Sequence, residues 1–180
     1  MAIEIEKKYR VTSEQFTELE SELADTGAEF VGEDFEENII YGGEVLAGDA
    51  VLRIRKTKAR TLLTFKRRIE NQSDAKQQVE IETEVADAGA TAEIIENLGL
   101  ASRLVYEKRR KTYKLKSAEI VLDELPFGLF VEIEGSLLAI KEAEMILGME
   151  DFVIEHETYP RLTARLGTAA GDVIEARFPA

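Results

Sequence analysis

Charged residues occupy alternate positions in the N-terminal segment EIEKKY, which begins at Glu4. Alternate side chains of a β-strand project from one face, so a strand here would place Glu4, Glu6 and Lys8 on one surface. Carboxylates supply hard oxygen ligands suited to Mg²⁺ or Mn²⁺, and basic side chains bind phosphate oxygens. Such a surface is either a solvated sheet face, which is the common case, or the wall of an ion-binding cavity.

The same alternation of apolar and charged residues returns in later segments. Basic pairs occur in VLRIRK and LLTFKRR, acidic pairs occur in VEIETEV and LFVEIEG, and the run LVYEKRRKTY alternates less cleanly. An open sheet would expose these charges to water, whereas acidic and basic pairs on different strands favour a closed barrel with a polar lumen. Periodicity alone leaves both interpretations open. The charged residues concerned are Arg53, Arg55, Lys66, Arg68, Glu80, Glu82, Lys108, Arg110, Glu132 and Glu134.

The alternating segments predict a strand-rich chain. Pro126 to Gly128 is typical of a tight hairpin connection between the last two strands. Residues 69–78 are polar and are expected to form a mobile loop. The predicted strands are the N-terminal segment and residues 35–41, 51–56, 62–68, 79–85, 104–113, 119–125 and 129–135.

Four segments carry the signals of amphipathic helices. Thr12 and Gln15 have the spacing of a capping box, and apolar residues follow at helical intervals. These helices need an apolar surface to cover, and the apolar faces of the strands supply it, so the charged faces are left over. The predicted helices start at Thr12, Thr91, Leu137 and Pro160 and end at Gly27, Gly99, Gly148 and Leu166.

The composition sets limits on the class of protein. The 180 residues are 44% hydrophobic, which fits one domain over residues 1–180. The net charge of −13 argues against nonspecific binding to nucleic acid or anionic membranes. No apolar run is long enough for a membrane span or a secretory signal, so we expect a cytoplasmic protein. The chain has no cysteine, and its one histidine, His156, is expected to have an ordinary surface or loop role.

The order of the charged segments is more specific than any one of them. Taken together, EIEKK, LRIRK, TFKRR, VEIETE, EKRRKTY and VLDELPFGLFVEIEG resemble the CYTH family, also called triphosphate tunnel metalloenzymes. The ExExK signature of that family corresponds to Glu4, Glu6 and Lys8, and the resemblance runs from about residue 3 to residue 166. The last segment is distinctive because family-like spacing is kept by Asp123, Gly128, Phe130, Glu132 and Glu134.

This resemblance implies an α+β fold, in which an eight-stranded antiparallel β-barrel forms a tunnel and amphipathic helices pack outside it. The tunnel would bind a triphosphate with a divalent metal, Mg²⁺ or Mn²⁺. Catalytic roles are implied for Lys8, Lys66, Glu80 and Glu82, the two glutamates holding a second metal or positioning the attacking water. The implied metal ligands are Glu4, Glu6 and Glu134, supported by Glu132 and Asp123. The implied phosphate-binding residues are Lys8, Arg53, Arg55, Lys66, Arg68, Lys108 and Arg110.

One segment departs from the family pattern. Many relatives carry Tyr or Phe followed by Asp on the second strand, whereas this chain has Ile40, Tyr41 and Gly42 there. Tyr41 either faces the lumen or packs outside the barrel. The missing aspartate leaves the role of this strand open.

The resemblance covers more than one activity, because the family includes class IV adenylate cyclases and thiamine triphosphatases. We expect hydrolysis of inorganic tripolyphosphate or an organic triphosphate. The alternatives are cyclisation of ATP to cyclic AMP and pyrophosphate, and a non-catalytic module that binds polyphosphate. The oligomeric state stays open. Whatever the reaction, a tunnel requires one common cavity for Glu4, Arg53, Arg55, Lys66, Glu82 and Glu134.

Overall fold

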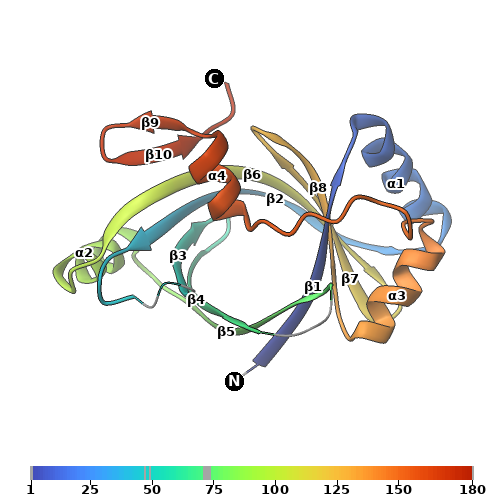
Figure 1. Cartoon of the computed structure of the whole chain (residues 1–180), viewed down its shortest axis with the longest axis horizontal. Coiled ribbons are helices and arrows are strands. Elements are labelled where there is room, and N and C mark those ends of the chain that lie inside the picture. Colours follow the sequence, from blue (N-terminus) through green and yellow to red (C-terminus); the bar gives the residue numbers. More distant parts are fainter. Residues whose placement is uncertain (1, 47, 49, 71–73, 180) are drawn as a thin grey trace.

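The computed structural model describes residues 2–46, 48, 50–70 and 74–179. Eight strands form a closed ring, in which each strand pairs antiparallel with both neighbours in the order β2-β3-β4-β5-β1-β8-β7-β6 and β6 pairs back with β2 (Figure 1). The predicted eight-stranded antiparallel barrel is confirmed. Its strands are β1 (Ala2–Val11), β2 (Glu29–Gly42), β3 (Ala50–Lys56), β4 (Thr61–Ile69), β5 (Lys76–Glu84), β6 (Ala101–Leu115), β7 (Ala118–Leu125) and β8 (Gly128–Glu134).

The sheet also contains two strands that the sequence did not predict. β9 (Thr168–Ala170) pairs antiparallel with β10 (Val173–Ala176), and β10 pairs parallel with β6. The complete sheet is therefore mixed. Segments of three and four residues are too short to show a period of two, which explains why the alternation did not reveal them.

The polar segment at residues 69–78 is not all loop. β4 continues through Ile69 and β5 begins at Lys76, while residues 71–73 lie outside the described part of the chain. Gln78 pairs with Glu4 of β1, and its side chain is buried. These strand residues are polar because one face of β5 lines a charged lumen. Their polar composition is also typical of a loop, which is why the loop prediction was wrong here.

The four predicted helices are present, with one incorrect N-terminus. The capping box of Thr12 and Gln15 is formed at the start of α1. The second helix is capped by Asp87, whose side chain accepts a hydrogen bond from the backbone of Ala90, and Thr91 lies in its first turn. The helices are α1 (Ser13–Asp25), α2 (Ala88–Asn97), α3 (Leu137–Ile146) and α4 (Tyr159–Leu166).

The helices pack on the barrel at separate places (Figure 1). α1 and α3 cover the outer face of β1, β7 and β8 through a core that includes Leu23, Ile133 and Ile140. α2 lies at the opposite end, where Ile95 packs with Tyr41 and Ile54. Tyr41 therefore packs outside the lumen. No described helix has the length and apolar character needed to cross a membrane.

The fourth helix lies over the ring rather than on an outer face (Figure 1). Leu162 and Tyr159 of α4 are buried in a cluster with Tyr106 of β6 and Phe130 of β8. Pro160 stands in the first turn, where its missing N–H leaves no helical hydrogen bond unmade. This packing brings the N-terminal end of α4 to the lumen.

Candidate active site

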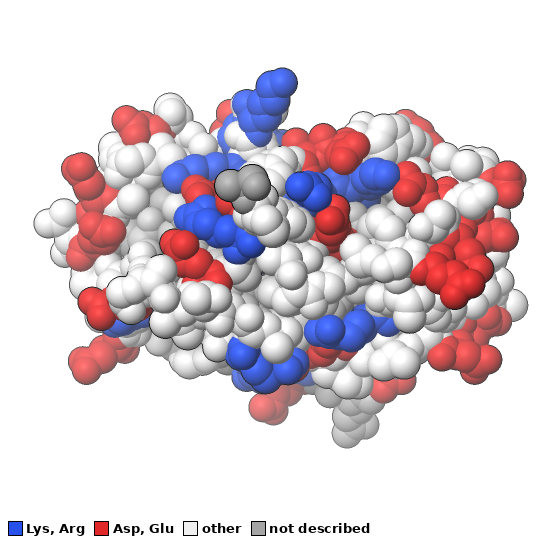
Figure 2. All heavy atoms as spheres, turned by 90° about the horizontal axis from the view of Figure 1, so that it is seen from above, with Lys and Arg blue, Asp and Glu red and all other residues white. Residues whose placement is uncertain are grey.

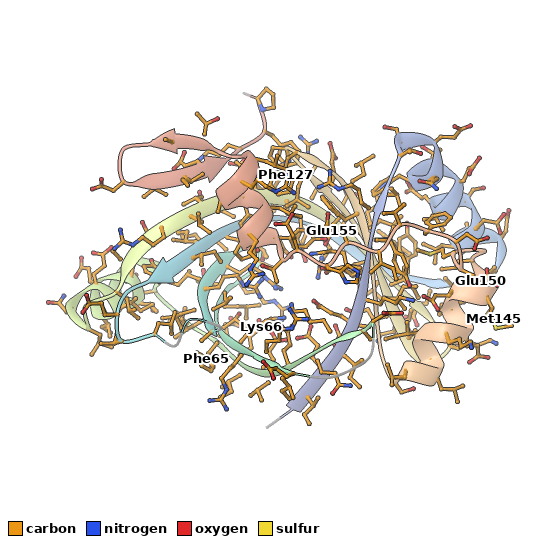
Figure 3. All side chains as sticks on the ribbon, viewed as in Figure 1. Phe65, Lys66, Phe127, Met145, Glu150 and Glu155 are labelled. Atoms are coloured by element: carbon orange, nitrogen blue, oxygen red, sulfur yellow. The ribbon has the colours of Figure 1, made fainter. Side chains whose placement is uncertain are left out.

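A cavity of about 610 Å³ lies within the ring of strands. Its lining comes from all eight ring strands and from α4 and the segment before it. Figure 3 shows why alternation places charges there: Lys66 points into the ring, whereas its neighbour Phe65 lies on the outer side of β4. The predicted common cavity is confirmed, and its lining includes Glu4, Glu6, Lys8, Arg53, Arg55, Lys66, Arg68, Glu80, Glu82, Lys108, Arg110, Glu132 and Glu134.

The charge of this cavity is opposite to that of the whole chain. Ten Lys and Arg side chains line it among the described residues, against seven Glu side chains, although the chain has a net charge of −13. On the face seen in Figure 2, acidic side chains lie at both ends of the molecule, and most basic side chains lie nearer the middle. A cation-rich cavity in an acidic protein favours an anionic ligand.

Glu4 is tied into a network with β4 and β5. Lys66 donates to Glu4 at 2.9 Å, and its Nζ also lies 2.8 Å from Glu80. Gln78 donates to Glu4 at 2.6 Å. Burial and Arg53 lower the pKa of Lys66, but Glu4, Glu6 and Glu80 outweigh them, so the pKa lies above its usual value. Lys66 is therefore a cation that joins three strands.

Glu6 and Glu134 lie opposite each other on β1 and β8 but have different surroundings. Lys76 donates to Glu6 at 2.9 Å, and although burial raises the pKa of Glu6, Lys76 and Lys66 bring it below its usual value. The side chain of Glu134 makes no hydrogen bond or ion pair with the side chain of another described residue. Partial burial, together with Glu4 and Glu119, raises the pKa of Glu134 to about 7. The carboxylates at this point carry unbalanced negative charge.

These carboxylates suit a divalent cation in their chemistry. Glu4, Glu6 and Glu134 offer hard oxygen donors, and a cation would relieve the repulsion that raises the pKa of Glu134. In the described part of the chain, no three Asp, Glu or His side chains are arranged as a closed metal cage. Mg²⁺ commonly takes one or two carboxylates and completes its shell with phosphate oxygens and water. The residues thus fit a metal shared with a ligand.

The two arginines of β3 have unused hydrogen-bonding capacity. An Nη of Arg53 donates to the hydroxyl of Thr64 at 3.4 Å and lies 3.9 Å from Glu82. The Thr64 hydroxyl donates to Glu82 at 2.7 Å. The Nε atoms of Arg53 and Arg55 are buried and have no hydrogen-bond partner among the described residues. Buried donors are normally satisfied, so the pairing of these two arginines is incomplete in this arrangement.

Asp123 lies behind the cavity wall instead of on it. Its side chain is fully buried and accepts two hydrogen bonds from Arg110, at 2.7 and 2.5 Å, and one from Tyr159 at 2.8 Å. Arg110 also donates to Glu132 at 2.6 Å. Asp123 is not among the described residues that line the cavity. Its contacts are those of a support for Arg110.

The ring of Tyr159 lines the cavity beside Lys8 and Lys108. The ammonium of Lys8 lies 4.1 Å from the centre of the Tyr159 ring, and that of Lys108 lies 5.4 Å from it. Both cations gain attraction from the ring face. Burial lowers the pKa of both lysines, which for Lys108 falls to about 8.

Several residues of the site were missed by sequence reasoning. Glu36 and Asn38 lie on β2 with the same period of two as the charged pairs, but Glu37 between them is also charged and hides the alternation. Nothing in the sequence indicated that Tyr159 belongs to the site, because helical periodicity does not show where a helix docks. His156 lies at the cavity and not only in an ordinary loop. Lining residues not predicted as functional include Arg60, Lys76, Gln78, Tyr106, Glu119, His156, Tyr159 and Arg161.

Comparisons with known proteins agree with this architecture. The family model described as "CYTH domain" matches residues 2–145. PH1012 protein from Pyrococcus horikoshii OT3 is 27% identical, with a TM-score of 0.78 over 88% of this chain and 98% of that one. No curated protein gives a significant match.

Two more distant structures share the fold. A protein from Vibrio parahaemolyticus described as a candidate adenylate cyclase is 19% identical, with a TM-score of 0.69 over 90% of this chain and 98% of that one. HpAC1 from Hippeastrum, for which a dominant triphosphatase activity is described, is 16% identical, with a TM-score of 0.68 over 92% of this chain and 96% of that one.

Proposed function

Because the chain belongs to the CYTH domain family, we propose that it binds a triphosphate in its barrel and hydrolyses it with a divalent cation. The observation that carries this proposal is the cavity itself, where ten cationic side chains and seven carboxylates of the described residues line one space inside an acidic protein. A triphosphate supplies several acceptor oxygens for these cations. The triphosphatase activity described for HpAC1, which shares the fold, supports the choice of hydrolysis.

The basic side chains bind and orient the substrate. Arg53 and Arg55 line the cavity and supply guanidinium groups for phosphate oxygens, and Arg110 is held in place by Asp123. Lys8 and Lys108 add charge where Tyr159 closes the cavity. Phosphoryl transfer depends mainly on such positioning and on stabilisation of the charge that develops on the phosphate oxygens.

The carboxylates divide into two groups. Glu4, Glu6 and Glu134 would supply carboxylate oxygens to the divalent cation, Mg²⁺ or Mn²⁺, together with oxygens of the substrate, and Glu132 lies on the same strand as Glu134. When bound, that cation acts as a Lewis acid on phosphate oxygens. Glu82, which accepts a hydrogen bond from Thr64, orients the attacking water from β5. Glu80 has a separate role, because its ion pair with Lys66 holds that ammonium in the cavity.

Product analysis tests the function directly. The protein is incubated with tripolyphosphate, ATP and thiamine triphosphate, each with Mg²⁺ and with Mn²⁺, and the products are resolved by chromatography. We expect release of phosphate without cyclic AMP. Cyclic AMP and pyrophosphate as main products would establish the cyclase alternative, and binding without turnover would establish a polyphosphate-binding module.

A pair of neighbouring residues on β4 provides the matched variants. Lys66→Met removes an ammonium that lines the cavity, and Arg67→Met removes a cation from the exposed side of the same strand. We expect Lys66→Met to lower kcat/KM by about tenfold or more, since loss of a charged contact is typically of that order. Arg67→Met should keep wild-type activity. Equal activities in the two variants would place the reaction outside the cavity.

A further inference from the structure

Glu36 is a buried carboxylate on the inner face of β2 that neither the charged pairs nor the ExExK signature includes. Its side chain is 2% exposed. An Oε atom lies 3.2 Å from the ammonium of Lys108 and 3.6 Å from Nε of Arg55, and it accepts a hydrogen bond from Asn38 at 3.2 Å. Glu36 thus contacts cations from two other strands of the ring, β6 and β3.

The carboxylate of Glu36 is held in its ionised form by neighbouring cations. Burial raises its pKa, but Lys108, Arg55, Arg110 and Arg53 outweigh burial and hold the pKa far below the usual value. Glu36 is therefore ionised at neutral pH. Only one other carboxylate, Asp123, forms an ion pair with Lys108 among the described residues. Removal of Glu36 would leave Lys108, Arg55 and Arg110 with less compensating charge.

A purely structural explanation accounts poorly for this arrangement. Buried ion pairs add little net stability compared with apolar residues of similar size. The distance between Glu36 and Arg55 Nε is longer than a hydrogen bond. In the part of the chain that the structure describes, neither Arg55 Nε nor the amide oxygen of Asn38 has a hydrogen-bond partner. The carboxylate is placed so that it orients two cations without using all of their donors.

We propose that Glu36 is a positioning residue, which holds Lys108 and Arg55 at the cavity wall in the orientation that binds substrate phosphate. This proposal rests on the proposed function, because it assumes that both cations bind a triphosphate. Glu36 itself lies behind them and is not among the described residues that line the cavity. The negative charge of Glu36 is therefore kept away from the anionic ligand, whereas Lys108 and Arg55 line the cavity that would hold this ligand.

Steady-state kinetics with tripolyphosphate and Mg²⁺ test the proposal through Glu36→Gln. We expect KM to rise about tenfold or more, with a smaller change in kcat, because the two cations contact phosphate before and during the reaction. Glu37→Gln is the matched control. Glu37 is the next residue on β2, and it pairs on the outer side of the barrel with Lys56 and Arg177. Its variant should keep the wild-type KM.

Two further variants separate positioning from folding. Glu36→Asp keeps the charge and should recover part of the lost affinity for tripolyphosphate. In a double-mutant cycle with Lys108→Met, the Glu36→Gln change should raise KM less than in the wild-type background, because one of its partners is gone. If Glu36→Gln does not fold, Glu36→Asp takes its place in the cycle. The Glu36→Asp change should then alter KM for tripolyphosphate less in the Lys108→Met background than in the wild-type background.

The outcomes distinguish this proposal from the proposed function. A wild-type protein that neither binds nor hydrolyses tripolyphosphate contradicts the proposed function. An active wild type whose folded Glu36→Gln variant keeps the same KM contradicts the positioning role alone. An equal rise in KM with and without Lys108 also contradicts it, since Glu36 would then act through other groups.

Discussion

Glu134 of β8 lies directly opposite Glu6 of β1, yet only Glu6 is paired with a cation, Lys76. Two carboxylates at equivalent positions in neighbouring strands therefore have pKa values shifted in opposite directions. The difference arises from their neighbours and not from their residue type. Because of this difference, we expect the glutamine variants of Glu134 and Glu6 to change the stability of the fold in opposite directions.

Glu134→Gln should raise the melting temperature at pH 8 and leave it nearly unchanged at pH 5. The pKa of Glu134 is raised to about 7, so protonation favours the folded state, and this contribution is lost as pH rises from about 4.5 through 7. Glutamine cannot ionise and avoids that loss. Thermal unfolding at the two pH values measures the effect, with exposed Glu84→Gln as control. A lower melting temperature at pH 8 would contradict the repulsion among Glu134, Glu4 and Glu119.

Glu6→Gln should destabilise the fold at neutral pH. The pKa of Glu6 is lowered, so its contribution to stability is present above about pH 4.5 and is lost as pH falls through the folded pKa. Glutamine leaves Lys76 without its carboxylate, at a cost of about 1–3 kcal/mol. Urea unfolding at pH 7 and pH 4 should show a difference from wild type that shrinks at the lower pH. A variant as stable as wild type at pH 7 would show that the pair contributes no stability.

The divalent cation should bind more tightly together with substrate than alone. In the described residues no three carboxylates form a closed cage, so a metal needs phosphate oxygens to complete its shell. Calorimetric titration with Mg²⁺, with and without tripolyphosphate, should show at least about tenfold tighter binding in its presence. Chelation should abolish hydrolysis. Equally tight binding of Mg²⁺ alone would indicate a preformed site.

The alternation of charged and apolar residues favoured a barrel without excluding an open sheet, and the resemblance to the CYTH family supplied the eight-stranded tunnel. That alternation places Glu4 and Lys66 inside and Phe65 outside, as Figure 3 shows for the β4 pair. It could not predict that Lys66 pairs with Glu4 and Glu80, because contacts across strands depend on register. The expected division into acids for metal and bases for phosphate is therefore less strict in the structure.

Other features depend on packing that no local pattern encodes. Asp123 has family-like spacing, but its burial beneath Arg110 and Tyr159 makes it a support for a cation. Tyr159 reaches the lumen because α4 docks over the ring, and the apolar stripe of a helix does not specify where it docks. Ile81 is 55% exposed, so the expected helical cover of the apolar sheet face is incomplete there.

Lys108 should impose an alkaline limit on substrate capture. Burial and Arg110 lower its pKa to about 8, against the opposing effects of Asp123 and Glu36. Its ammonium therefore loses its proton as pH rises through about 8, and kcat/KM for tripolyphosphate, which reports on the free enzyme, should then fall by up to about tenfold per pH unit. Lys66, whose pKa is raised, should not contribute to this limit. Lys108→Arg keeps its charge at every pH measured, so its profile should stay flat to higher pH. A wild-type profile that is flat to pH about 9.5, or the same alkaline limit in Lys108→Arg, would show that another group sets it.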